Sequence, residues 1–282
     1  MNPLLLEEQL RQFYTEDLGF GDVTTRAIFK ETDLANGSVY SKANGVFCGT
    51  AVVRACYRLF DPAIHPVFYK HDGDTIRPGE EIFRTEGHIS DLLAAERVML
   101  NILQHLSGIA TRTRRMVRIL EGTGVEIADT RKTTPGLRML EKYAVKTGGG
   151  NNHRLRLDDA AMIKDTHVAA AGSITRAVEF VKQATGHMTR IEVEVESFAQ
   201  FLEAIHANAD VIMIDNTPPD IAKSWLQSKP ENITIEYSGN VTEDTLSAIA
   251  KSGVDVISAG CLTHTVTPVD MSFTLQEQKE DV

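Results

Sequence analysis

From residue 125 onward, short apolar runs alternate with longer segments in which apolar residues recur every three or four positions. The short runs are typical of buried strands and the longer segments of helices. We predict strands at residues 125–128, 161–163, 191–195, 211–214, 234–237 and 254–259. We predict helices at residues 173–184, 197–207, 220–227 and 242–252. This alternation indicates a parallel sheet, and because no strand has the pattern of an edge, we expect an incomplete barrel of six or seven strands, with an open doubly wound sheet as the alternative.

The first hundred residues have a different pattern, in which short strands are mixed with helices. Helical spacing at residues 4–14 and 51–59 surrounds two short strand candidates, 38–42 and 45–48, and the Asn44-Gly45 pair between them is a hairpin signal. Turn residues punctuate further short strands up to residue 87, so we expect a small sheet packed on helices. Apolar residues at helical spacing over residues 92–120 predict a long helix, interrupted near Ser107-Gly108 and followed by a second helix.

Composition excludes several classes of protein. Hydrophobic and charged contents of 42% and 24% are those of a soluble globular protein, and no apolar run approaches the ~20 residues of a membrane span. The N-terminus lacks the pattern of a signal peptide. Three cysteines without CxxC spacing argue against a disulfide framework or a zinc site, and we expect a cytoplasmic protein.

Polar residues or glycine follow all six predicted strands. In a barrel the carboxyl ends of the strands meet at one mouth, where ligands bind, so we interpret these residues as one shared site rather than as ordinary polar loops. In strand order they are Thr130, Arg131 and Lys132; Lys164 and Asp165; Glu194 and Glu196; Asp215 and Asn216; Ser238, Gly239 and Asn240; and Gly260.

The cations of this set predict an anion site. Arg131 and Lys132 follow the first strand directly, and the glycines at 148–150 lead into His153 and Arg154, where backbone amides could approach a ligand closely. Between residues 131 and 164 there are eight Lys or Arg against three acids, in a chain of formal net charge -10. A basic pocket in an acidic protein suits a small anion with more than one charge, such as a phosphate or a dicarboxylate, and not nucleic acid. The alternative is a basic solvated surface.

Carboxylates complete the predicted site. Glu192, Glu194 and Glu196 share one face of their strand, and Glu194 and Asp215 come from successive strands. Two such acids could hold Mg²⁺, bind ribose hydroxyls, or stabilise positive charge developing on a sugar carbon. The alternative is a structural ion-pair network with Lys132 and Lys164. The glycine-containing turns at 238–240 and 259–261 are typical of phosphate loops at the last strands of a barrel.

Ten short motifs, in this order, together resemble the quinolinate phosphoribosyltransferase family over nearly the full length of the chain. They are EDLGFGDVTT (16–25), AERVMLN (95–101), LSGIAT (106–111), DTRKTTPGLR (129–138), EKYAV (141–145), NHR (152–154), IKD (163–165), EVEVE (192–196), MIDN (213–216) and LTH (262–264). The resemblance implies an N-terminal α/β sandwich (residues 1–108), joined by the C-terminal segment 266–282, and a C-terminal incomplete α/β barrel (109–265), with the last helix returning to the first domain. It implies transfer of phosphoribose from phosphoribosyl pyrophosphate to quinolinate with loss of CO₂, giving nicotinate mononucleotide and pyrophosphate for NAD synthesis, with Mg²⁺.

The resemblance also implies residue roles and an assembly. Arg131, His153, Arg154 and Lys164 resemble the quinolinate clamp, with Thr130 and Lys132 beside them, and Lys132 and Lys164 are expected to stabilise charge during decarboxylation. Glu194 and Asp215 resemble the acids that hold ribose and metal. Arg97 resembles an arginine lent to a neighbouring subunit, in a homodimer with shared sites from which a hexamer of three dimers could be built. The phosphate loops would be Ser238, Gly239, Asn240, Ala259, Gly260 and Cys261.

Two departures from the family and several rivals remain at this stage. Arg156 stands where the family usually has a small residue or Asn, and Thr166 replaces an Asn, which puts substrate fine-tuning in doubt. The rivals are a molybdenum-associated paralogue, a nicotinate phosphoribosyltransferase, an aldolase using Lys164 as a Schiff base, and a catalytically silent sensor of phosphorylated sugars.

Overall fold

The computed structural model describes residues 1–277, and its internal contacts divide the chain into two compact units. One unit contains Met1–Arg112 together with the described residues from Val266 onward, and the other is Thr113–Thr265. The expected return segment 266–282 is only partly covered, because residues 278–282 lie outside the described part. In that part, no helix is both long enough and apolar enough to cross a membrane.

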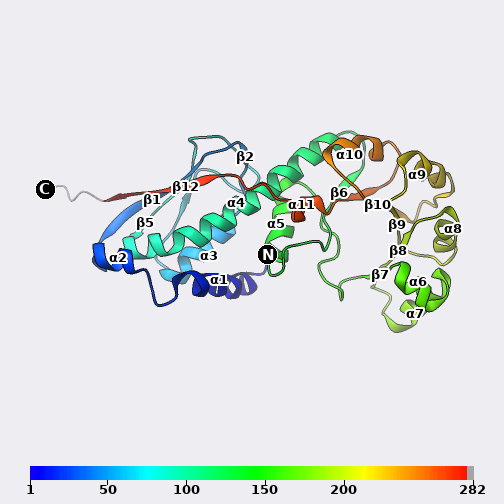
Figure 1. Cartoon of the computed structure of the whole chain (residues 1–282), viewed down its shortest axis with the longest axis horizontal. Helices are drawn as coiled ribbons and strands as arrows, with labels where there is room; N and C mark the ends of the chain where they lie inside the picture. The colour runs from blue at the N-terminus through cyan, green and yellow to red at the C-terminus, as the bar shows by residue number, and fades with distance from the viewer. Residues whose placement is uncertain (278–282) are drawn as a thin grey trace. The chain divides into compact units, whose positions relative to one another are not determined.

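The first unit is built on an antiparallel sheet. Its strand order is β12-β1-β5-β3, formed by Met271–Glu277, Leu34–Ser41, Glu81–His88 and Val67–Phe68. The expectation that the last segment is a helix was wrong, since β12 pairs with β1 in antiparallel register from Ser41↔Met271 to Ala35↔Glu277 (Figure 1). The reason is visible in its sequence, where Met271, Phe273 and Leu275 alternate with polar residues, the period of a strand.

Three helices accompany this sheet: α1 (Pro3–Leu18), α2 (Val23–Ile28) and α3 (Thr50–Phe60). The Asn2 side chain caps α1 by accepting a hydrogen bond from the backbone N–H of Leu4, and Pro3 occupies the first turn. Helix α1 packs on α3, and Tyr14 meets Phe60 edge to face, with 4.8 Å between ring centroids.

The sequence predictions at two glycines of this unit were wrong: a hairpin turn at Gly45 and a helix interruption at Gly108. The predicted hairpin at Asn44-Gly45 does not form, because β2 (Gly45–Val46) pairs with β4 (Thr75–Ile76) and not with β1. A Cβ at Gly45 would lie 2.9 Å from both Thr111 and Val269. This glycine therefore permits close packing.

The predicted interruption at Ser107-Gly108 is also wrong, since α4 is one helix from Ile89 to Leu120. The buried Ser107 hydroxyl accepts a hydrogen bond from the backbone N–H of Cys48 at 3.1 Å. A Cβ at Gly108 would lie 2.4 Å from the carbonyl oxygen of Thr267. Small residues mark the place where other segments pack against this helix, and packing outweighs the weak helix propensity of glycine.

The second unit contains six parallel strands in the order β6-β11-β10-β9-β8-β7. They are Glu126–Ala128, Val256–Ser258, Thr234–Ser238, Val211–Asp215, Ile191–Val195 and Ala161–Ile163. All six were predicted to within two residues at each end, and the predicted fold class is confirmed. The sheet is open between β6 and β7, the first two strands of this unit along the chain. Beyond β6, an isolated parallel bridge joins Ala128 to Asn151, which precedes β7.

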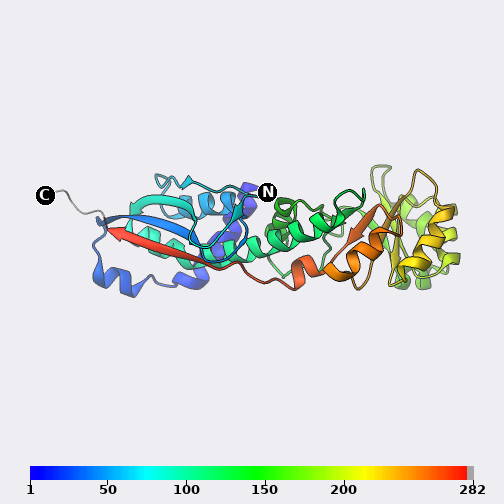
Figure 2. The same ribbon diagram turned by 90° about the horizontal axis from the view of Figure 1, so that it is seen from above.

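Helices follow the strands and cover the outer side of the sheet (Figures 1 and 2). The four predicted helices are α7 (Ile174–Ala184), α8 (Phe198–His206), α9 (Pro219–Trp225) and α10 (Glu243–Ala250). The structure adds three that were not predicted: α5 (Arg138–Gly148), α6 (Asp165–Ala171) and α11 (Cys261–His264). Two of them, α6 and α11, are too short to give a clear hydrophobic period.

Candidate active site

A cavity of about 330 Å³ lies at the carboxyl ends of the parallel strands. Residues in or shortly after each of the six strands contribute to its wall, as at the mouth of a barrel. Its lining residues are Thr130, Arg131, Lys132, His153, Arg154, Met162, Lys164, Glu194, Met213, Asp215, Ser238 and Ser258.

The structure places three of the predicted strand-end residues, Asp165, Glu196 and Asn216, outside the cavity lining. Of the fifteen residues to which the family resemblance assigns a role, nine line the cavity and six do not. These six are Arg97, Gly239, Asn240, Ala259, Gly260 and Cys261. Arg97 belongs to the other unit, on α4, where its side chain is 60% exposed and its guanidinium lies 3.4 Å from the Glu96 carboxylate.

The cavity carries an excess of positive charge. Arg131, Lys132, Arg154 and Lys164 face two carboxylates, Glu194 and Asp215. The Nε atoms of Arg131 and Arg154 are buried and have no hydrogen-bond partner in the described protein. Burial, together with the charge of Arg131, lowers the pKa of Arg154. Two guanidinium groups that repel each other and keep unpaired donors form a site that a dianion would stabilise.

The acids of the cavity are held by their neighbours. Glu194, on β8, forms an ion pair with Lys164, which follows β7. Asp215, at the end of β9, accepts a hydrogen bond from the Asn216 side chain at 2.7 Å. The predicted alternative of an ion-pair network is therefore present in part, and it orients the same side chains that line the cavity.

The turn after β10 supports the Asp215 side of the cavity. Gly239 and Asn240 have φ of 98° and 50°, and Asn216 has φ of 47°, so all three lie in the left-handed region. A Cβ at Gly239 would lie 2.2 Å from Oδ1 of Asn216, and the Asn240 side chain donates to that same oxygen at 3.3 Å. These residues shape the turn beside Asp215 and Ser238.

The turn after β11 supports Lys132. A Cβ at Gly260 would lie 3.0 Å from Cδ of Lys132, and the Thr263 hydroxyl donates to the Lys132 carbonyl at 2.8 Å. Ala259 is fully buried, and the Cys261 thiol donates to the carbonyl of Val241. The glycine at 260 therefore lets the lysine stem lie against the turn.

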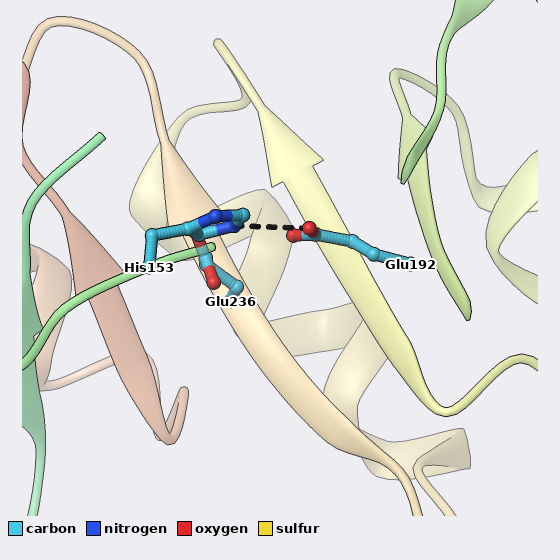
Figure 3. A group of neighbouring side chains, drawn as sticks. All are labelled: His153, Glu192 and Glu236. Carbon is cyan, nitrogen blue, oxygen red and sulfur yellow. Dashed lines mark ion pairs between the residues drawn. The ribbon is translucent and has the colours of Figure 1, made fainter. Parts of the chain in front are cut away.

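His153, which lines the cavity, forms a cluster with two buried acids, Glu192 and Glu236 (Figure 3). The Nε2 of His153 is 2.9 Å from Glu192 on β8 and 3.6 Å from Glu236 on β10. Burial lowers the pKa of His153, but the hydrogen bond and charge of Glu192 outweigh it and the net pKa is raised. Burial and the charge of Glu192 raise the pKa of Glu236 to about 7. The two acids were not expected to meet, because only Glu192 was noticed in the sequence.

The ligand atoms of this cluster lie within 4.8 Å of one another, but its hydrogen bonds disfavour a metal. The Nδ1 of His153 accepts a hydrogen bond from the backbone N–H of Arg154 at 2.8 Å. The neutral ring therefore carries its proton on Nε2, facing the carboxylates. A histidine that binds a metal through Nε2 normally donates from its other nitrogen, which this backbone contact prevents.

Three lining residues, Met162, Met213 and Ser258, were missed as site residues. Each stands two positions before a strand-end residue, and side chains two apart share a face of a strand. Met162 precedes Lys164, Met213 precedes Asp215, and Ser258 precedes Gly260 in this way. Glu236 likewise stands two positions before Ser238. Applying the two-residue period to each strand end could therefore have found Glu236 and the three missed lining residues.

Fold and cavity together define the class: an α/β-barrel protein with a cavity of cations and carboxylates at its strand ends. Residues 22–107 match the family described as quinolinate phosphoribosyl transferase, N-terminal domain, and residues 109–274 match the corresponding C-terminal domain. The chain belongs to the quinolinate phosphoribosyltransferase family.

Individual relatives agree over the full length. A protein of Bacillus subtilis named probable nicotinate-nucleotide pyrophosphorylase (carboxylating) is 47% identical, with 100% of this chain and 97% of that protein covered. The nicotinate-nucleotide pyrophosphorylase (carboxylating) of Mycobacterium leprae is 37% identical, with 95% and 96% covered. The crystal structure of NadC from Streptococcus pyogenes superposes with a TM-score of 0.95 at 37% identity, covering 99% of each chain.

Proposed function

We propose that this protein transfers the phosphoribosyl group of phosphoribosyl pyrophosphate to quinolinate with loss of CO₂. The products are nicotinate mononucleotide and pyrophosphate, in the biosynthesis of NAD. The observation that carries the proposal is the pairing of Arg131 and Arg154, two half-buried arginines whose buried Nε donors are unpaired, at one wall of a cavity whose other residues include Glu194 and Asp215. A dicarboxylate suits the first pair and a sugar donor suits the second.

The geometry supports distinct roles for the cations and the acids. Arg131 and Arg154 would bind the two adjacent carboxylates of quinolinate, with His153 forming part of the same wall. Glu194 and Asp215 would bind the ribose and stabilise the positive charge that develops at its reacting carbon. When CO₂ leaves, an electron pair remains on the ring carbon next to nitrogen, and the charges of Lys132 and Lys164 would stabilise it.

The residues of the cavity also fit Mg²⁺, which prefers carboxylate oxygens. Glu194 and Asp215 line the same cavity and would hold it together with the pyrophosphate of the donor. The ion would neutralise charge on the departing pyrophosphate.

We also propose a homodimer in which Arg97 completes the site of the neighbouring subunit. Two observations support this proposal: Arg97 is largely exposed, and the first unit exposes large apolar side chains, among them Leu4 (77%), Val23 (80%) and the fully exposed Phe20. Contiguous patches of such side chains are typical of interaction surfaces. Since no disulfide joins Cys48, Cys56 or Cys261 in the described chain, we place the protein in the reducing cytoplasm.

Release of labelled CO₂ tests the function. Quinolinate labelled at its 2-carboxyl group should yield labelled CO₂ and an equal amount of nicotinate mononucleotide, only when phosphoribosyl pyrophosphate is present. Nicotinate offered in place of quinolinate should give no nucleotide, which separates this activity from a nicotinate phosphoribosyltransferase. Absence of donor-dependent CO₂ release would reject the proposal.

A further inference from the structure

The opening in the barrel lies beside the arginine pair. Strands β6 and β7 are not paired, and between them Asn151 makes a backbone bridge beside β6, where it donates to the Ile127 carbonyl at 2.8 Å and accepts from the Asp129 N–H at 3.1 Å. The backbone ladder therefore stops just before His153 and Arg154. Something other than strand pairing must fix the position of these two residues.

Beyond the last backbone hydrogen bond to β6, a buried ion pair holds the chain in place. Lys142, on α5, forms an ion pair with Asp129, and the two side chains are 2% and 0% exposed. The Lys142 ammonium also donates to the His153 carbonyl at 2.8 Å, and the His153 N–H donates to the Asp129 carboxylate at 2.9 Å. The Asn152 side chain donates to Asp129 at 2.5 Å and to the Lys142 carbonyl at 2.9 Å.

This network joins the two segments that carry the arginines. Asp129 stands two residues before Arg131, and His153 stands directly before Arg154. The two guanidinium groups repel each other, so their separation has to be imposed by the backbone that carries them. Neither Asp129 nor Lys142 lines the cavity, and any effect on a ligand must pass through the residues they hold.

Stability alone gives a weak reason for a charged pair at this place. A buried ion pair is often no more stable than an apolar replacement of similar volume, because removing both charges from water is costly. Burial here raises the pKa of Asp129 and lowers that of Lys142, which shows that the interior penalises both charges. The benefit lies in the directed hydrogen bonds that an apolar pair cannot make.

We infer that Asp129 and Lys142 are positioning residues that set the separation of Arg131 and Arg154 to fit two adjacent carboxylates on one ring. This inference rests on the proposed function, and it names residues that do not touch the substrate. It predicts an effect on quinolinate and not on the sugar donor, whose proposed ligands Glu194 and Asp215 lie on β8 and β9.

A double-variant experiment separates positioning from stability. Asp129→Asn and Lys142→Met alone each leave one uncompensated buried charge, and both should lower the melting temperature. The double variant removes both charges and should recover most of that loss. Its KM for quinolinate should still be at least about tenfold higher than that of the wild type, with the KM for phosphoribosyl pyrophosphate within about twofold. A double variant with the wild-type KM for quinolinate would overturn the inference.

Two further variants complete the design. Asn152→Ala removes two hydrogen bonds of the network without exposing a charge, so it tests the same claim if the double variant does not fold; the same rise in KM supports positioning, and an unchanged KM overturns it. The matched control is Asp255→Asn with Lys229→Met, an ion pair of the same unit outside the cavity lining, which should leave both KM values unchanged. If the wild type does not convert quinolinate at all, the proposed function itself fails.

Discussion

Individual side chains around the cavity are already oriented by hydrogen bonds or ion pairs with specific neighbours. Lys164 is paired with Glu194, Asp215 is held by Asn216, and the guanidinium of Arg154 donates to the Ala160 carbonyl at 2.8 Å. Contacts of this kind reduce the reorganisation needed on binding. Substitutions at these positions should therefore affect turnover more than folding.

Lys164→Ala should lower kcat by about 100- to 1,000-fold, because it removes a positive charge from the place where a carbanion develops. Steady-state rates with both substrates saturating would measure this. Lys182→Ala is a suitable control, since Lys182 lies on α7 and bonds only the carbonyls of Ala207 and Asn208. Near-normal turnover in Lys164→Ala would remove this lysine from the chemistry.

Gly239→Ala should destabilise the protein by about 1 to 3 kcal/mol, because alanine is strained at a φ of 98° and its Cβ would meet Asn216. Since Asn216 orients Asp215, the KM for phosphoribosyl pyrophosphate should rise as well. Thermal unfolding and steady-state kinetics would record both effects. Gly122→Ala is the matched control, as Gly122 also has a positive φ, with no atom within 4 Å of its Cβ position; it should cost stability without changing that KM.

At the scale of elements, the strands and their polar ends could be predicted because both depend on local pattern. Apolar runs marked β6 to β11, and the residue types that follow them marked the cavity wall. The hairpin at Gly45 and the break at Gly108 were wrong because a glycine has the same sequence signature whether it turns the chain or admits a neighbour. The meeting of Glu236 with His153 and Glu192 could not be predicted without the curvature of the sheet.

That buried cluster predicts a pH dependence of stability. The folded-state pKa of Glu236, about 7, lies above its ordinary value of 4.5. Folding therefore favours its protonated form, and this contribution is fully present below about pH 4.5 and is lost as the pH rises through about 7. Glu236→Gln removes the titrating group. The melting temperature of the variant minus that of the wild type should therefore be more positive at pH 8 than at pH 5. Equal differences at the two pH values would contradict this assignment.

At the scale of the whole molecule, the central question is whether one chain holds a complete site. Arg97 lies in the first unit and every cavity residue in the second, and the family resemblance that drew attention to Arg97 gives it a role in another subunit. That role depends on how two subunits meet.

Complementation between inactive variants can test it. Arg97→Ala and Lys164→Ala homodimers should each be nearly inactive. After mixing and subunit exchange, half of the dimers should be mixed, and each mixed dimer should contain one site with both residues intact. The mixture should therefore recover about one quarter of wild-type activity. No recovery, despite exchange shown by mass spectrometry, would place Arg97 in the site of its own chain.

In the proposed function, Arg131 and Arg154 together bind a doubly charged pyridine. Calorimetric titration of quinolinate into the wild type should give one site per chain, with nicotinate, which has a single carboxylate, binding at least about tenfold more weakly. Arg131→Gln and Arg154→Gln should each weaken quinolinate binding by about 10-fold or more and bring it close to that of nicotinate. Equal affinity for the two ligands in the wild type, or unchanged quinolinate affinity in both variants, would contradict the account.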